Sequence, residues 1–250
     1  MRLEQLPLLN VALFSGLRRG SIDSLEVDGY VIKNYTNQNS QVAGIVAQFY
    51  NPIFAVNSAS LTNSINNATI ISNTLSYAVA GIAAVTNRGT IFNCKNNNTV
   101  TGNANYLGGI SATISNNSTI SQCINNGSLE NTSGGANSKA GGIIAKIFMG
   151  NVLNCLNLGV VKGNNRVGGI VGDMNALTTN IISENINHGF TKGTSNVGGI
   201  LGFMNGGMVS NNSNFSVVEG DSNVGCIVGL KNGGTVINNH YDTQMCGEED

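Results

Sequence analysis

The sequence predicts an all-β fold, a single right-handed parallel β-solenoid of about eight coils that covers residues 1–250, with a terminal tail at 241–250. Three observations predict it. A Gly-Gly-Ile segment recurs about every 30 residues, Gly and Asn recur at fixed positions between these segments, and only 10% of the residues are charged. The right hand follows from the general preference for right-handed crossovers between parallel strands.

The composition excludes several classes of protein. With 41% hydrophobic residues the chain can bury a core, but a soluble globular protein usually carries about 25% charged residues, so Asn, Ser and Thr must cover much of this surface. Because Asn and Gly are poor in helix interiors, a helix bundle is excluded. The net charge of -1 indicates no basic stripe that could bind nucleic acid. The chain also lacks a run of 18 apolar residues, the length that could span a membrane as a helix.

One isoleucine marks each copy of the repeat, and successive copies lie roughly 27 to 37 residues apart. Leu13 fits one step before the first copy. The segment Met1–Gly16 has a weak signal-peptide character, but Glu4 and Asn10 interrupt it, so we expect it to belong to the first coil. The marking residues are Ile45, Ile82, Ile110, Ile143, Ile170, Ile200 and Ile227.

Three corners are expected in each coil, because Gly and Asn accept backbone conformations that other residues avoid. The first follows a second anchor, found at Leu25, Cys94, Cys123, Cys155, Asn185, Ser213 and His240, and contains Asn96, Asn125, Asn157 and Asn187, then Asn98, Gly127, Gly159 and Gly189. The second has Gly102, Gly163, Gly193 and Gly220; the third has turns such as Asn87-Arg88-Gly89, Asn205-Gly206-Gly207 and Asn232-Gly233-Gly234. Three corners leave three short strands per coil, and we expect the stacked Asn amides to be structural.

These residues resemble the GLUG-motif repeats of bacterial surface proteins. The resemblance lies in the Gly-Gly-Ile/Leu-Val-Gly core, the Asn-x-Cys-x-Asn-x-Gly corner and the segment 240–243. It implies β-solenoid segments of the kind found in large adhesins and in the non-catalytic regions of IgA-specific metallopeptidases. This chain departs from the motif with Ile in place of Leu, Ala in the early copies and Cys226 at a glycine position. It lacks a His-Glu-x-x-His site, so no peptidase activity carries over.

The function expected is that of a structural or adhesive extracellular or cell-surface rod, as a filament subunit or a fragment of a larger adhesin. The partners would be proteins, including copies of the chain, or glycans. A glycan-binding or glycan-cleaving solenoid is the alternative. We expect no enzyme and predict no catalytic, cofactor-binding or metal-binding residue, because the sparse acids, Asp173 among them, form no predicted pair and neither His188 nor His240 has a nucleophile nearby.

A lesser alternative is an ice-binding solenoid, which needs a flat row of threonines. Thr69, Thr90, Thr119 and Thr235 share an approximate position in their coils. Gly150, Thr179 and Met208 are the residues expected to interrupt the row.

The five cysteines lack Cys-x-x-Cys spacing, so we expect Cys94, Cys123 and Cys155 to form a ladder of buried thiols. A disulfide between neighbours in that ladder remains geometrically conceivable. Cys226 and Cys246 lie at other positions and are expected to be free. The alternative for Cys246 is a disulfide with another chain.

The segment Val167–Gly172 is apolar on both sides of a strand, with Val167 and Val171 on one side and Ile170 on the other. Three interpretations stay open: a strand covered on both faces, a strand bent at Gly168-Gly169, or an apolar outer stripe. The third would provide a surface for self-association. The acidic end, Glu248, Glu249 and Asp250, could cap one end of the rod.

Overall fold

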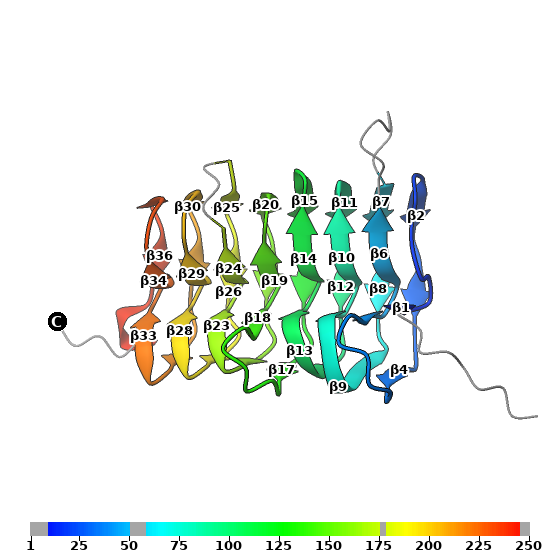
Figure 1. Cartoon of the computed structure of the whole chain (residues 1–250). Helices are drawn as coiled ribbons and strands as arrows, with labels where there is room; N and C mark the ends of the chain where they lie inside the picture. Colours follow the sequence, from blue (N-terminus) through cyan, green and yellow to red (C-terminus); the bar gives the residue numbers. More distant parts are fainter. Residues whose placement is uncertain (1–9, 51–58, 176–178, 246–250) are drawn as a thin grey trace, which may run out of the picture.

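A computed structural model describes residues 10–50, 59–175 and 179–245, and these form a parallel β-solenoid (Figure 1). Every strand pair in this part of the chain is parallel, and each strand pairs with its equivalent one coil away. The only helical segment described is the 3-10 turn η1 (Thr243–Met245). The predicted fold class is therefore confirmed.

Each coil contributes strands to four sheets, so the expectation of three strands per coil is wrong. Sheet B contains β6 (Val46–Tyr50), β10 (Ala83–Asn87), β14 (Ser111–Ser115), β19 (Ile144–Ile147), β24 (Val171–Met174), β29 (Leu201–Met204) and β34 (Val228–Lys231). Sheet C contains β2 (Ser21–Asp23), β7 (Ala59–Thr62), β11 (Gly89–Phe92), β15 (Ser118–Ser121), β20 (Gly150–Leu153), β25 (Ile181–Ser183), β30 (Met208–Ser210) and β35 (Thr235–Ile237).

Sheet D contains β3 (Glu26–Val27), β8 (Ile65–Asn66), β12 (Lys95–Asn96), β16 (Ile124–Asn125), β21 (Leu156–Asn157), β26 (Ile186–Asn187), β31 (Ser213–Asn214) and β36 (His240–Tyr241). Sheet A joins two strand rows through the long strands of the early coils. Its strands are β1 (Asn10–Val11), β4 (Tyr30–Lys33), β5 (Gln41–Ala43), β9 (Thr69–Ala80), β13 (Val100–Gly108), β17 (Leu129–Asn131), β18 (Lys139–Gly141), β22 (Val161–Lys162), β23 (Asn165–Gly168), β27 (Thr191–Lys192), β28 (Ser195–Gly198), β32 (Val218–Glu219) and β33 (Ser222–Gly225).

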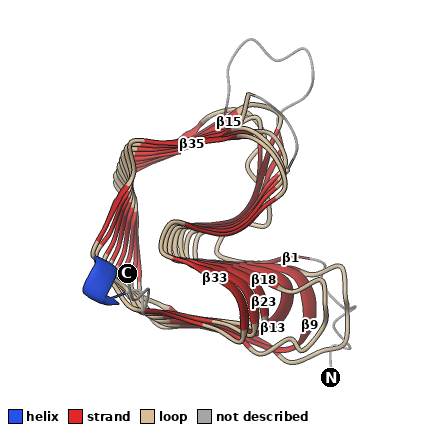
Figure 2. Cartoon of the chain, turned by 90° about the vertical axis from the view of Figure 1, so that its left-hand side faces the viewer, coloured by secondary structure: helices blue, strands red, loops and turns tan. Residues whose placement is uncertain are grey.

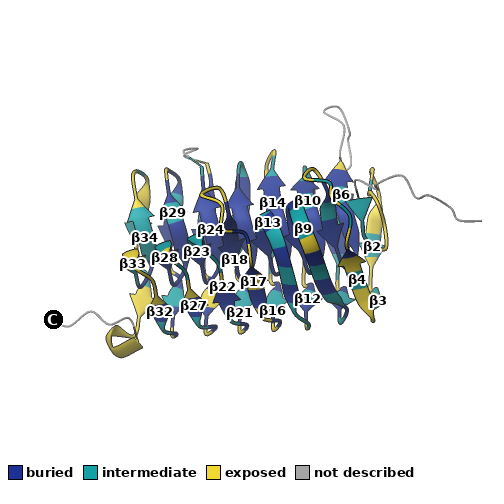
Figure 3. Cartoon of the chain, turned by 60° about the horizontal axis from the view of Figure 1, so that its bottom comes forward, coloured by how far each residue is buried: buried dark blue, intermediate teal, exposed yellow. Residues whose placement is uncertain are grey.

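The expected number of coils is close, since sheets C and D have eight strands each and sheet B has seven. Seen from the C-terminal end, the chain runs counter-clockwise from β33 through β35 to the terminal helix while advancing toward the viewer, which is a right-handed coil (Figure 2). Burial is deepest in the middle coils, and exposed residues gather in the first and last coils, at β2 to β4 and β32 to β36 (Figure 3).

The Gly-Gly segment is a bend that folds the coil inward, so that the strand after it lies against the strand before it (Figure 2). β23 and β24 illustrate this bend. A Cβ on Gly168 would meet the carbonyl oxygen of Val171 at 1.8 Å, so only glycine permits this approach. Of the three interpretations of Val167–Gly172, the bend at Gly168-Gly169 is correct.

The same bend divides the interior into two cores. Val167 packs with the valines and leucines of sheet A, whereas Ile170 and Val171 pack with the residues of sheets B and C. All three side chains are fully buried, so the apolar outer stripe, and a self-association surface based on it, is wrong. The chain is apolar on both sides here because the two strands around the bend face different cores.

An amide ladder runs through sheet D, as predicted. Each Asn Nδ2 donates to the Oδ1 of the next coil at 2.8 or 2.9 Å, and also to a carbonyl two residues ahead. Besides the four predicted residues, the ladder includes Asn66 and Asn214. Gly127 does not have a positive φ. It is needed because a Cβ there would meet the carbonyl oxygen of Asn98 at 1.9 Å.

The left-handed corner lies between sheets C and D, one residue before the second anchor. Its φ angles lie between 50° and 59° at Ser24, Asn63, Asn93, Gln122, Asn154, Glu184, Asn211 and Asn238. The anchors that follow are Leu25, Ser64, Cys94, Cys123, Cys155, Asn185, Asn212 and Asn239. The assignments to Ser213 and His240 are thus wrong by one residue, because Ser213 pairs with Ile186 and with His240 on sheet D.

The ladder cysteines Cys94, Cys123 and Cys155 are buried free thiols, as expected. Cys226 is disulfide-bonded, so the expectation that it is free is wrong. Cys246 and the acidic end, Glu248 to Asp250, lie outside the described residues.

Candidate functional site

Four charged side chains are buried in the described part of the chain, and three of them lie together. Lys139, Lys146 and Asp173 meet beside Arg166 where sheets A and B face each other. We call these four residues the basic cluster. In a chain with so few charges, burying three of them in one place is the clearest departure from the repeat.

The inward bend places the cluster. Lys139 and Arg166 stand on β18 and β23 of sheet A, one residue before the paired Ala140 and Val167. Lys146 and Asp173 pair directly on β19 and β24 of sheet B. Because the chain reverses at the Gly-Gly corner, the two strand rows of sheets A and B bring these side chains together.

Asp173 connects the cluster. Lys146 Nζ donates to Asp173 Oδ1 at 2.6 Å and to Asn175 Oδ1 at 2.9 Å. An Nη of Arg166 donates to the other carboxylate oxygen of Asp173. Both oxygens of the only carboxylate in the cluster are therefore engaged by two of its three cations.

Lys139 has weaker support. Its ammonium donates to the carbonyl of Asn137 at 2.7 Å. Burial lowers the pKa of Lys139 to about 8, and the nearby Asp173 carboxylate only partly opposes this effect. Two donors of its ammonium have no acceptor among the described residues.

One polar atom of the cluster also lacks a partner among the described residues, the buried Nε of Arg166. A buried donor without an acceptor costs about 1 to 3 kcal/mol, so native proteins rarely keep one without a reason.

Aromatic rings surround the cations. Lys139 Nζ lies 5.2 Å from the ring centre of Tyr106, Lys146 Nζ lies 5.4 Å from that of Phe148, and Arg166 stacks over Phe203 at 4.1 Å. Tyr106 also makes edge contacts with Tyr77 at 5.1 Å and with Phe148. Burial raises the pKa of Tyr106 to about 12, so its phenol stays neutral near pH 8. The site therefore combines positive charge with half-buried rings.

Sequence reasoning missed this cluster. The sequence predicts no partner for Asp173, although Lys146 and Asp173 each follow a repeat isoleucine, Ile143 or Ile170, by three residues. Opposite charges at one position in successive coils are a readable signal. The fact that Lys139 and Arg166 face them could not be read, because it depends on the inward bend.

The other predicted features form no comparable site. On the outer face of sheet C, Thr90 and Thr119 are neighbours, but the row continues with Asn151, Ile181 and Met208 before Thr235. Thr69 lies in sheet A and not in this row. His188 stacks on Phe215 at 5.2 Å. His240 is exposed on the last strand of sheet D.

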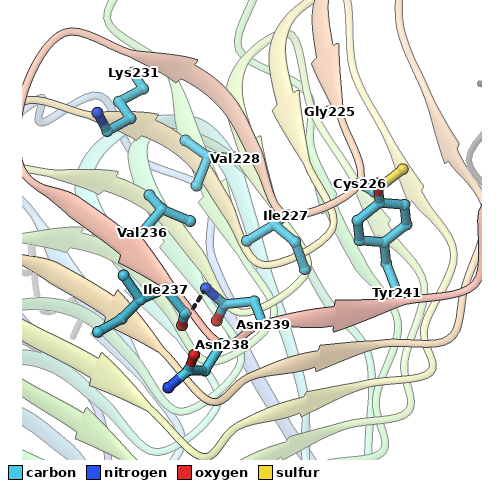
Figure 4. Close-up of a pocket in the computed structure, with 10 residues that line it drawn as sticks. All are labelled: Gly225, Cys226, Ile227, Val228, Lys231, Val236, Ile237, Asn238, Asn239 and Tyr241. Atoms are coloured by element: carbon cyan, nitrogen blue, oxygen red, sulfur yellow. Dashed lines mark hydrogen bonds between the residues drawn. The ribbon is translucent and has the colours of Figure 1, made fainter.

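Two hollows lie away from the basic cluster. One, of about 440 Å³, opens at the end of the last coil and is lined by the final core residues, among them Ile227 and Val236 (Figure 4). The other, of about 220 Å³, lies between corner amides and sheet D, near Asn93 and Lys95. Neither contains a buried polar side chain without a partner.

The described residues include no group of three His, Cys, Asp or Glu placed to hold a metal ion. In the same part of the chain no helix is long and apolar enough to cross a membrane. In comparisons with known proteins, no family model, no curated protein and no solved structure matches the chain.

Proposed function

We propose that the chain is a structural, adhesive repeat rod of the cell surface or extracellular space, without catalytic activity. The observation that carries the proposal is the continuous register of the stack. Eight strands follow one another in sheets C and D, and backbone and amide ladders connect every coil to the next. Such a stack makes a stiff rod that holds surfaces at fixed spacing.

Two further observations support this setting. The disulfide at Cys226 favours an oxidising compartment, where such bonds persist. The resemblance of the repeat to GLUG-motif segments favours a surface protein. Both support an extracellular or cell-surface location.

A filament subunit is one form of this proposal. Within the described residues, β33, β34, β35 and β36 each have one neighbouring strand, so their outer edges offer free backbone groups. Val224, Ile237 and Tyr241 are exposed there. Light scattering over a range of concentrations tests this form: growth in mass supports it, and a constant monomer mass contradicts it.

The adhesive role is tested in the source organism. We expect antibodies against the rod to label intact cells, and deletion of the chain to reduce attachment to surfaces. Labelling that appears only after lysis would contradict the proposal. Attachment that is unchanged by the deletion would also contradict it.

Glycan binding is the second candidate function, favoured by the aromatic rings beside the basic cluster. A carbohydrate array separates it from an inert rod. Hydrolysis products in the same assay would indicate a glycan-cleaving enzyme instead.

A further inference from the structure

The charge balance of the basic cluster is incomplete. It contains three cations and a single carboxylate, and Lys146 and Arg166 already occupy both oxygens of Asp173. Buried charges are stable when they are paired and hydrogen-bonded. Lys139, which is 6% exposed, has only a neutral carbonyl as acceptor. The cluster thus has room for one more negative charge.

The unpartnered donors indicate what would supply it. Nε of Arg166 and the remaining ammonium hydrogens of Lys139 are donors without an acceptor among the described residues. Lys139 lies close enough to Arg166 for their charges to interact. A planar or tetrahedral oxyanion, with several acceptor oxygens, matches such a set of donors.

The backbone at Arg166 lies in the left-handed region. Arg166 has a φ of 52°, and the equivalent residues of the next two coils, Asn196 and Asn223, have φ angles of 54° and 51°. Asparagine tolerates this left-handed conformation better than arginine does. Arg19 and Arg88 have a φ of 55° as well, so the conformation alone does not distinguish Arg166. Its side chain pairs with Asp173 and is 30% exposed, although its Nε is buried.

The aromatic rings favour an anionic group attached to a larger molecule over a free anion. Tyr77, Tyr106 and Phe148 are half-buried and form a continuous row of edge contacts beside the cations. Half-exposed rings next to charged groups suit a ligand that has an apolar face beside its charge, as a sugar ring does.

We propose that the basic cluster binds an acidic saccharide through a carboxylate or sulfate group, which accepts hydrogen bonds from Arg166 and Lys139. This inference deepens the glycan-binding form of the proposed function and rests on it.

The experiment titrates the full chain with three oligosaccharides of equal length: a polygalacturonate fragment, a sulfated chondroitin fragment and a neutral galactan fragment. Calorimetry measures affinity, and NMR follows the Nε–H signal of Arg166. We expect one or both acidic fragments to bind saturably and to shift that signal, and the neutral fragment not to bind. Whichever acidic fragment binds identifies the group recognised.

The variants are R166Q and K139Q, the second of which leaves the pair between Arg166 and Asp173 in place. Circular dichroism verifies that each is folded. We expect each to weaken binding by about tenfold or more, since each removes a charged hydrogen bond. The matched control is K192Q, which removes a lysine from an exposed ion pair with Glu219 and should leave affinity unchanged.

The inference is overturned if neither acidic fragment binds, or if K192Q weakens binding as much as R166Q does. Equal binding of neutral and acidic fragments, unaffected by R166Q, would also overturn it while leaving glycan binding in place. Failure of the cell-surface labelling would instead contradict the proposed function, whatever the fragments do.

Discussion

Replacing the buried Asn125 with alanine should destabilise the rod more than the same replacement of its exposed neighbour Asn126. Asn125 is fully buried in the sheet D ladder. Its Nδ2 donates to the carbonyl of Gly127 and to Asn157 Oδ1, each at 2.8 Å, and its Oδ1 accepts from Asn96 Nδ2 at 2.8 Å. Alanine removes all three hydrogen bonds at once.

The magnitude follows from what the substitution leaves behind. Each hydrogen bond contributes about 1 kcal/mol net, and each buried polar group left without a partner costs about 1 to 3 kcal/mol. Asn96 keeps its second acceptor, the carbonyl of Asn98, so it loses less than Asn157 does. We expect the free energy of unfolding to fall by about 3 to 5 kcal/mol.

The assay is guanidinium unfolding followed by circular dichroism. Asn126→Ala is the matched control, because the neighbouring Asn126 also donates to an Asn of the previous coil at 2.8 Å, but in solvent. The control should change the free energy of unfolding by less than about 0.5 kcal/mol. Equal losses for the two variants would refute the reasoning that burial makes the ladder strong.

Three further predictions concern the bend, the cysteines and the basic cluster. Gly169→Ala should destabilise the fold by about 3 kcal/mol or more in the same assay, since its Cβ would meet the carbonyl oxygen of Gly199 at 2.2 Å, whereas Gly134→Ala meets nothing within 4 Å and should be neutral. Lys139 has a pKa of about 8 in the fold and 10.5 as its ordinary value, so the unfolded chain binds more protons between these two pH values. The stability of the wild type relative to Lys139→Met should therefore rise as pH increases from about 8 to 10.5, and a constant difference would contradict this. The titratable or charged groups around the ammonium are Asp173, Arg166, Lys146 and Tyr106. The thiols of Cys94 and Cys123 should resist a thiol-reactive dye until the protein unfolds. A hydrogen bond with Cys123 and burial raise the pKa of Cys94, and burial raises the pKa of Cys123. Rapid labelling of the native protein would contradict this prediction.

The ladders could be predicted because stacking repeats the same environment in each coil. A buried amide that hydrogen-bonds to its own kind works only with Asn above and below, so Asn96, Asn125 and Asn157 show both the period and the stack in the sequence. The isoleucines are equally readable, since all of them from Ile45 to Ile227 pack in one core.

The inward bend could be predicted only as one of three interpretations, because its cause is a contact distant from the glycines in sequence. Gly169 is required by Gly199 and by the side chain of Asn187, which lie one coil ahead and on another sheet. The slip from Asn212 to Ser213 has a related cause. Coils differ in length: Asn185 lies 15 residues after Ile170, whereas Asn212 lies 12 residues after Ile200, so counting from the isoleucine loses the register.

The anchor ladder shows why Cys and Asn can replace each other in such a stack. The N–H of Cys94 donates to Cys123 Sγ at 3.4 Å, and the N–H of Cys155 donates to Asn185 Oδ1 at 2.9 Å. The backbone N–H after the left-handed corner points to the next coil, where no carbonyl pairs with it. The side chain of the next anchor residue must therefore accept its hydrogen bond. Sulfur accepts weakly and an amide oxygen accepts well. Residue identity in this ladder is therefore determined by the N–H of the preceding coil and by the small space between the corners, and not by chemistry directed at a ligand.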